Sequence, residues 1–140
     1  MNERTAAGFI LANLSSGSPR YLLLRSARTG DWLPPKGHTD EGEDTLQTAL
    51  RETAEETGIT DVQVVDGFEQ VIEYDVDSRK RGSYHKKVTY LLGTSATTDV
   101  ECSSEHSEAD WFTLEDALEA ITFDQMREVL RAADAYLTSH

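Results

Sequence analysis

A glutamate-rich stretch between residues 37 and 59 restricts the fold more than any other feature of the chain. It reads GHTDEGEDTLQTALRETAEETGI, and a helix that turns about 100° per residue places Glu52, Glu55 and Glu56 on one face. Like charges at this spacing destabilise a helix by roughly a few tenths of a kcal/mol per pair unless a cation shares them. Carboxylate oxygens suit Mg²⁺ or Mn²⁺. We expect a helix that holds cations on one face and packs with the other, through Leu46, Ala49, Leu50, Thr53 and Thr57.

The ends of this helix are marked by residues with known capping behaviour. Asp44 or Glu43 can cap its start, and Gly58 is a usual residue just after a helix ends. Arg51 lies among the acids, and its planar guanidinium can hold a carboxylate with two parallel hydrogen bonds. We therefore interpret Arg51 as an ion-pair partner that orients a glutamate of the acidic face.

Apolar runs predict strands around this helix and further helices after them. Pro34 and Pro35 exclude helix from the preceding loop and leave Lys36 extended before Gly37, which suits a tight turn beside a ligand. This order of elements indicates an α/β or α+β fold with a mixed β-sheet sandwiched between helices, in a single domain covering residues 1–140. The expected strands span residues 5–13, 21–26, 62–76, 87–95 and 108–112, and the later helices residues 114–121 and 123–137.

Length and composition limit the classes of protein to consider. A chain of 140 residues with 38% hydrophobic content fits one domain with a real core. It has no apolar run of 18 residues, and its start lacks the features of a secretory signal, so we expect a cytoplasmic protein without membrane contact. The formal net charge of −13 argues against binding long nucleic acid. We also expect a monomer.

Basic residues gather in one short segment of this acidic chain. Residues 79–87 hold five of the 13 lysines and arginines, with Tyr84 and His85 between them. Strand alternation predicts that either Lys86 or Lys87 points inward. A solvated loop remains the alternative for Arg79, Lys80 and Arg81.

The acidic stretch resembles the Nudix box. The residues that carry the resemblance are Gly37, Glu43 and residues 51–59, which follow one another at the spacing of that motif. In that family a glycine loop and a helix hold the metals that hydrolyse nucleoside diphosphates linked to another group. Thr53 stands where the general box has an aliphatic residue. The resemblance implies the Nudix fold for the whole chain and binding of more than one Mg²⁺ or Mn²⁺ ion.

Within that family the chain is similar to the asymmetrical diadenosine tetraphosphate hydrolases. The similar segments are AAGFIL, YLLLRS, DWLPPKGHTDEGED, ALRETAEETGI, SSEHSEADWF and FDQMREVL. The resemblance implies hydrolysis of a dinucleoside polyphosphate to ATP and AMP by water. The metal ligands that it implies are Glu52, Glu55, Glu56 and Glu105. The catalytic residues that we expect are Glu56, Glu105, Arg51 and Lys36.

The resemblance also implies which residues bind the substrate. They are Tyr74 and Phe123 around adenine, and Lys86 and Lys36 on the phosphates. From the residues alone, Tyr74 and Phe123 fit equally as core aromatics. Ala27 and Asp31 replace an aromatic residue and a His of similar hydrolases, and Ser104 replaces a His. Alternative substrates are RNA 5′ ends, ADP-ribose and diphosphoinositol phosphates, and a nucleotide sensor without turnover is a further alternative.

Overall fold

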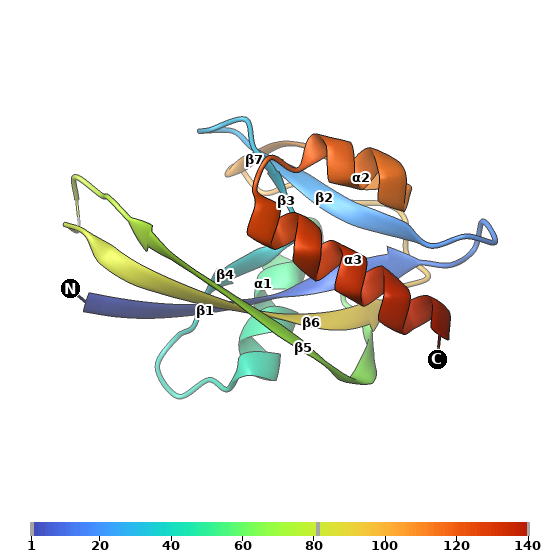
Figure 1. Cartoon of the computed structure of the whole chain (residues 1–140), viewed down its shortest axis with the longest axis horizontal. Helices are drawn as coiled ribbons and strands as arrows, with labels where there is room; N and C mark the ends of the chain where they lie inside the picture. The colour runs from blue at the N-terminus through green and yellow to red at the C-terminus, as the bar shows by residue number, and fades with distance from the viewer. Residues whose placement is uncertain (1, 81, 140) are drawn as a thin grey trace.

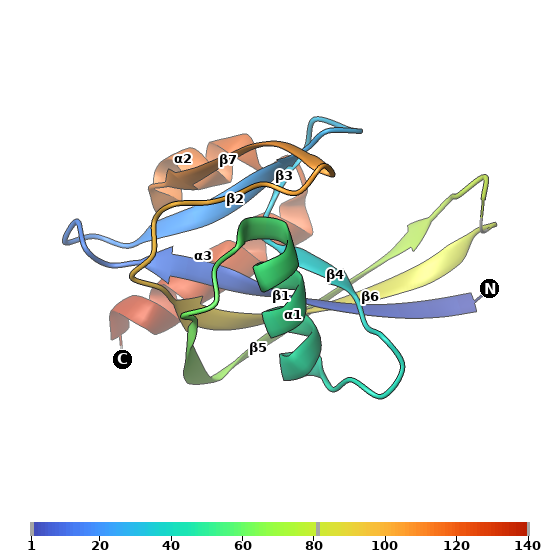
Figure 2. The same ribbon diagram turned by 180° about the vertical axis from the view of Figure 1, so that it is seen from behind.

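The structure, a computed structural model, describes residues 2–80 and 82–139. Its mixed β-sheet lies between α1 on one face and α2 and α3 on the other (Figures 1 and 2), which confirms the fold class expected from the sequence. The strands are β1 (Asn2–Asn13), β2 (Arg20–Ser26), β3 (Trp32–Leu33), β4 (Lys36–His38), β5 (Gln63–Val76), β6 (Tyr84–Thr94) and β7 (His106–Phe112). The helices are α1 (Thr45–Thr57), α2 (Leu114–Ala120) and α3 (Asp124–Ser139). No helix within the described residues is both long and apolar enough to cross a membrane.

Strand β1 is the centre of the sheet and is buried on both faces from residue 6 onward. Ala6 and Ile10 pack in the cluster beneath α2 and α3, whereas Ala7 and Phe9 pack in the cluster beneath α1. Because both faces are covered, the strand reads as a continuous apolar run without polar alternation. Its parallel pairing with β6, from Asn2 opposite Tyr84 onward, brings the amino-terminal strand beside the basic segment.

The partner of β1 on its other edge changes along its length. Its Ala6–Gly8 part pairs with β4, and its end pairs with β2. Between the two, the Phe9 amide donates to the Pro35 carbonyl oxygen at 3.2 Å. A Cβ on Gly8 would overlap that oxygen and would lie 2.5 Å from the Cβ of Lys36. The missing side chain of Gly8 therefore lets β4 approach closely and fixes Lys36 where the sheet divides.

The boundaries of α1 confirm the capping prediction, but its packing face differs from the prediction. Asp44 caps the helix, and Gly58 ends it in the left-handed conformation with φ 77°. The prediction that Leu46 and Leu50 pack inward is wrong, since they are 39% and 37% exposed. Small side chains lie beneath the helix instead, because α1 packs close to β1 and has rotated Glu56 inward. The buried residues of α1 are Thr48, Ala49, Thr53, Glu56 and Thr57.

The basic segment agrees with the prediction from strand alternation. Lys86 is buried and Lys87 is exposed on β6. Arg79 and Lys80 are exposed in the turn between β5 and β6, and Arg81 lies outside the described residues. Lys86 is thus the lysine of this segment whose side chain lies inside the molecule.

Replacing Gly8 with alanine should destabilise the protein. The added methyl group meets backbone atoms that cannot move independently of β4, so we expect the free energy of unfolding to fall by about 1–3 kcal/mol. Urea unfolding measures this change. Thr5→Ala, at an exposed position of the same strand, should change stability by less than about 0.5 kcal/mol. Equal stability of Gly8→Ala and Thr5→Ala would show that β4 does not need this close approach.

Candidate active site

The acids of the box region converge on the guanidinium of Arg51. Each of its five N–H groups has an acceptor: Nε and Nη2 donate to Glu43, Nη1 donates to Glu52 and Glu55, and Nη2 also donates to the carbonyl oxygen of His38. The shortest of these bonds is 2.7 Å, from Nε to Oε2 of Glu43. The hydrogen bonds from Arg51 hold the pKa of the Glu43 carboxyl well below its ordinary value. The ion pair expected for Arg51 is therefore present, and it also ties the loop after β4 to α1.

Glu56 lies inside the structure, separate from this network. Its side chain is 6% exposed, and its Oε1 accepts a hydrogen bond of 3.1 Å from the backbone amide of Lys36. Burial raises the pKa of Glu56 from 4.5 to about 7, and the charges of Glu52 and Glu105 add to the increase. The amide and charge of Lys36 oppose it. The acidic face predicted for α1 therefore includes one buried carboxylate, because α1 turns Glu56 toward β4.

Glu52 occupies a recess that Gly37 leaves open. A Cβ on Gly37 would overlap the carboxyl group of Glu52. Burial raises the pKa of Glu52, with further increases from Glu55 and Glu105, while Arg51 opposes them. Glu55 is more exposed and lies at the rim, 3.1 Å from Nη1 of Arg51.

Glu105 reaches the same site from a different part of the chain. The amide of Ser103 donates to the carbonyl oxygen of Glu56 at 3.3 Å, so the turn before β7 runs along the end of α1. Glu105 is exposed, and its charge raises the pKa of both Glu52 and Glu56. Four acids from two segments therefore share one site.

These acids suit divalent cations in their chemistry. Hard carboxylate oxygens are the ligands that Mg²⁺ and Mn²⁺ prefer. Burial is the main cause of the raised pKa values of Glu52 and Glu56, and a cation would offset the negative charge that adds to it. Among the described residues, no three His, Cys, Asp or Glu side chains already converge as a preformed metal site. One oxygen each of Glu52 and Glu55 accepts from Arg51, and one oxygen of Glu56 accepts from the Lys36 amide. A metal would use the other oxygens or displace Arg51.

A buried lysine faces this acidic site from the sheet. Lys86 is 9% exposed, and its Nζ lies 6.0 Å from the centre of the Tyr74 ring, directly across the β5–β6 ladder. Burial and then the charge of Lys36 lower the pKa of Lys86 to about 8, against the opposing charge of Glu56. The structure thus brings Lys36, Lys86 and Tyr74 together with Glu56, although they are far apart in sequence.

The structure connects Phe123 to the candidate site less directly than it connects the other candidate residues. It is 47% exposed just before α3. The side-chain oxygen of Gln125 accepts from the Glu73 amide at 3.4 Å, and its side-chain N–H donates to the Glu73 carbonyl oxygen at 3.1 Å. These two bonds attach the start of α3 to β5 beside Tyr74. No ring contact joins Phe123 to Tyr74 among the described residues. Tyr74 itself packs partly against the core cluster beneath α3, so its side chain has a structural role as well.

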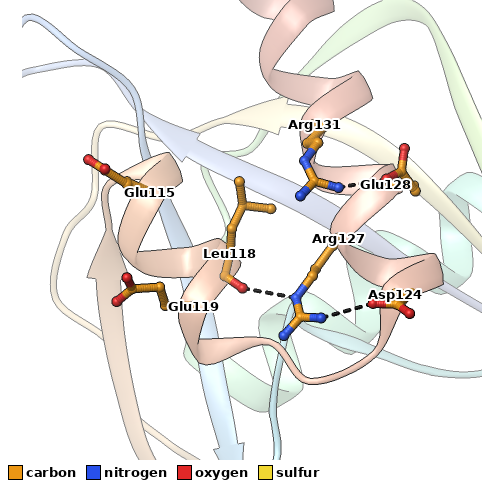
Figure 3. A pocket seen from close by; sticks show the side chains of 7 residues that line it. All are labelled: Glu115, Leu118, Glu119, Asp124, Arg127, Glu128 and Arg131. Carbon is orange, nitrogen blue, oxygen red and sulfur yellow. Dashed lines mark hydrogen bonds and ion pairs between the residues drawn. The ribbon is translucent and has the colours of Figure 1, made fainter.

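A groove between α2 and α3 contains none of the candidate residues (Figure 3). Its two arginines are already engaged: Arg127 bonds the carbonyl oxygen of Leu118 at 3.0 Å and the carboxylate of Asp124 at 2.9 Å, and Arg131 bonds Glu128 at 2.6 Å. Its remaining charged residues are acids, Glu115 and Glu119. This groove is therefore unsuited to an anionic ligand.

Backbone groups are the part of the site that sequence reasoning missed. The amide of Lys36 holds Glu56, and the carbonyl oxygen of His38 holds Arg51. Every residue has such groups, so no residue type marks them. The Pro-Pro-Lys-Gly segment was the available signal, because an extended strand beside a helix exposes its amide groups.

The fold and this site define a hydrolase of the Nudix type, and comparison with known proteins agrees. The family model described as NUDIX domain matches residues 2–133, and the chain belongs to this family. Hydrolases of the family generally use divalent metal ions.

Individual relatives are similar along almost the whole chain. The asymmetrical bis(5'-nucleosyl)-tetraphosphatase of Rattus norvegicus is 36% identical, over 93% of this chain and 88% of its own. The enzyme of the same name from Caenorhabditis elegans is 35% identical, over 94% and 95%. The crystal structure of a C. elegans Ap4A hydrolase binary complex aligns with a TM-score of 0.87 at 32% identity, covering 98% of this chain and 99% of that one.

Glu56 should make the stability of the metal-free protein depend on pH. Between pH 4.5 and about 7 the folded carboxyl keeps its proton while the unfolded one has lost it, so the unfolded chain binds fewer protons and stability falls as pH rises. The expected loss is roughly 3 kcal/mol, in urea unfolding with a chelator present. Glu56→Gln keeps an oxygen for the Lys36 amide and should remove most of this loss.

Glu55→Gln is the matched control for that measurement, because it removes the same charge from the exposed rim of the site. It should keep most of the wild-type pH dependence. An unchanged pH dependence in Glu56→Gln would contradict the raised pKa of that carboxyl.

Proposed function

We propose that this protein hydrolyses diadenosine tetraphosphate to ATP and AMP by attack of water at a phosphoanhydride. The observation that carries the proposal is the meeting of two kinds of group in one site. Glu56 accepts a hydrogen bond of 3.1 Å from the backbone amide of Lys36, and the charges of Glu56 and Glu52 raise the pKa of the buried Lys86. A polyphosphate bridged by divalent ions needs both kinds of group. The similarity to asymmetrical tetraphosphatases over almost the whole chain supports the choice of substrate.

The proposed ligands for more than one Mg²⁺ or Mn²⁺ ion are Glu52, Glu55, Glu56 and Glu105. When bound, such ions supply neutralisation of the phosphate charge and activation of water. Arg51 acts as a positioning residue, because its hydrogen bonds orient Glu52 and Glu55 and tie them to the end of β4. Without ions it also offsets part of the repulsion among these acids.

The chain's other residues bind substrate and move a proton in this proposal. Lys36 and Lys86 contact the phosphates and offset charge on the leaving ATP. Glu56 or Glu105 accepts the proton from the attacking water, since both carboxylates lie at the acidic site. Tyr74 and Phe123 stack on adenine, and the attachment of α3 to β5 places them on neighbouring segments. We propose that the protein works in this way as a monomer.

The products in ¹⁸O-labelled water test both the substrate and the direction of attack. With Mg²⁺, diadenosine tetraphosphate should give AMP and ATP with the label in AMP, because water attacks the phosphorus that bears one adenosine and ATP leaves. Mass spectrometry of the products measures this. Two molecules of ADP would exclude the asymmetrical cleavage, and label in ATP would move the nucleophile to the other side of the broken bond.

A substrate panel in the same assay separates the alternatives. It contains RNA with a 5′ triphosphate, ADP-ribose and a diphosphoinositol phosphate beside the dinucleotide. Higher kcat/KM on any of these would replace the proposed substrate while keeping the chemistry. No turnover of any compound, together with nucleotide binding, would indicate a sensor.

Removing the aromatic ring of Tyr74 should weaken substrate binding. A base stacked on an aromatic side chain contributes about 1–3 kcal/mol, so Tyr74→Ala should raise KM for the dinucleotide roughly tenfold. Because Tyr74 also packs against the core, Tyr74→Leu is needed as a second variant that keeps apolar volume without a ring. Both should raise KM, with thermal unfolding monitored in parallel. A normal KM in Tyr74→Leu would assign the residue to the core alone.

A further inference from the structure

Strand β5 lies at one end of the sheet, so one of its edges has no neighbouring strand within the residues that the structure describes. Such an edge leaves outward-pointing backbone N–H and C=O groups without a sheet partner, and proteins commonly cover it. Helix α3 covers this edge at two points. The Tyr136 hydroxyl donates to the Asp66 carbonyl oxygen at 2.6 Å, and the Gln125 side chain bonds the backbone of Glu73. The helix is therefore attached to β5 near both of its ends.

The contact at Glu73 reproduces the hydrogen bonding of a neighbouring strand. The Glu73 amide donates to the Gln125 side-chain oxygen at 3.4 Å, and the Gln125 side-chain N–H donates to the Glu73 carbonyl oxygen at 3.1 Å. In an antiparallel ladder the two backbone groups of a residue point to the same side, and this side alternates along the strand. The backbone of Glu73 therefore faces away from β6, and one carboxamide supplies the donor and the acceptor that a further strand would supply.

Glu73 is held from the side of β6 as well. Its carboxylate oxygen lies 3.0 Å from Nε2 of His85 on β6, while Tyr74, the next residue, pairs with Lys86 across the ladder. The residue before Tyr74 thus contacts α3 through its backbone and β6 through its side chain. These contacts fix the part of β5 that carries the Tyr74 ring.

Gln125 also lies in the first turn of α3, close to Phe123. The Phe123 carbonyl oxygen accepts from the Arg127 amide at 3.1 Å, so Phe123 begins the hydrogen-bonded part of the helix. Met126 in the same turn is fully buried in the core cluster. The start of α3 therefore shifts along β5 only if the two bonds of Gln125 break and Met126 moves within a closely packed core. Gln125 directly links the segment that carries Phe123 to the segment that carries Tyr74.

We propose that Gln125 is a positioning residue for base binding, and that its two hydrogen bonds to Glu73 set the separation between the rings of Tyr74 and Phe123. The inference rests on the proposed function for the role of these two rings. Stacking depends on close approach, because dispersion attraction is lost over a gap of less than about 1 Å. The groups proposed to bind phosphate lie outside this contact. Gln125 should therefore affect ligands that carry a base and leave the binding of phosphate alone unchanged.

Titration calorimetry with two ligands and Mg²⁺ tests the inference. ATP carries adenine and a triphosphate, whereas inorganic tripolyphosphate has no base. Gln125→Ala should bind ATP about three- to tenfold more weakly than wild type, as expected for partial loss of stacking, and tripolyphosphate equally well. Alanine favours helix more than glutamine does, so this variant does not weaken α3 itself. Gln125→Glu keeps the acceptor but places a negative charge beside the Glu73 carbonyl oxygen, and it should also lose affinity for ATP selectively.

Gln70→Ala is the matched control. It makes the same change at an exposed position of β5 that lies opposite Tyr90 in the ladder, away from the start of α3. It should bind both ligands as wild type does. Equal ATP affinity in Gln125→Ala and Gln70→Ala would overturn the inference.

Steady-state kinetics provide a second readout. Gln125→Ala should raise KM for diadenosine tetraphosphate with kcat within about twofold of wild type, because the lost contact binds the base and not the reacting phosphate. An equal loss of affinity for ATP and tripolyphosphate would show a general disturbance of the site and would contradict the positioning role, as would a lack of ATP binding by wild type. If Gln125→Ala loses ATP affinity selectively but wild type does not cleave the dinucleotide, the proposed function fails and the role of Gln125 stands.

Discussion

The guanidinium of Arg51 is the interaction on which the candidate site depends. Its hydrogen bonds to Glu43, Glu52 and Glu55 supply positive charge to acids that would otherwise repel one another along α1. A further bond, to the carbonyl oxygen of His38, joins the end of β4 to the helix. Since every N–H group of this side chain has an acceptor, its position is determined by the whole loop–helix unit. A lysine could not replace it, because its three N–H groups radiate from one atom.

One edge of β1 pairs first with β4 and then with β2. This arrangement places cations beside the acids of α1. Gly8 lets β4 pair with β1, which positions the Lys36 amide against Glu56. Parallel pairing of β1 with β6 then brings the basic segment alongside, with Lys86 turned inward. Acids on a helix therefore meet lysines from the two strands that flank β1, β4 and β6. An acidic protein can bind an anionic substrate in this way, because local charge at the site differs from the net charge.

Many local features of the fold could be predicted from the sequence. Asp44 and Gly58 have capping tendencies that act within one turn of the chain, and the structure places both at the ends of α1. The inward turn of Lys86 follows from strand alternation in the same way. The packing face of α1 was predicted wrongly for Leu46 and Leu50, because the rotation of a helix depends on the surface beneath it. Here that surface is a closely approaching β1, which accommodates threonine and alanine and draws Glu56 toward the Lys36 amide.

The sequence by itself determined the acidic helix, the spacing of its glutamates and the resemblance to a family, because these are properties of residues close together in the chain. Only the tertiary structure decided that Glu56 is buried and that the turn before β7, which carries Glu105, lies against the end of α1. These relations join segments separated by tens of residues. They depend on strand pairing and on backbone hydrogen bonds, which all residues can form, so no pattern of side chains records them.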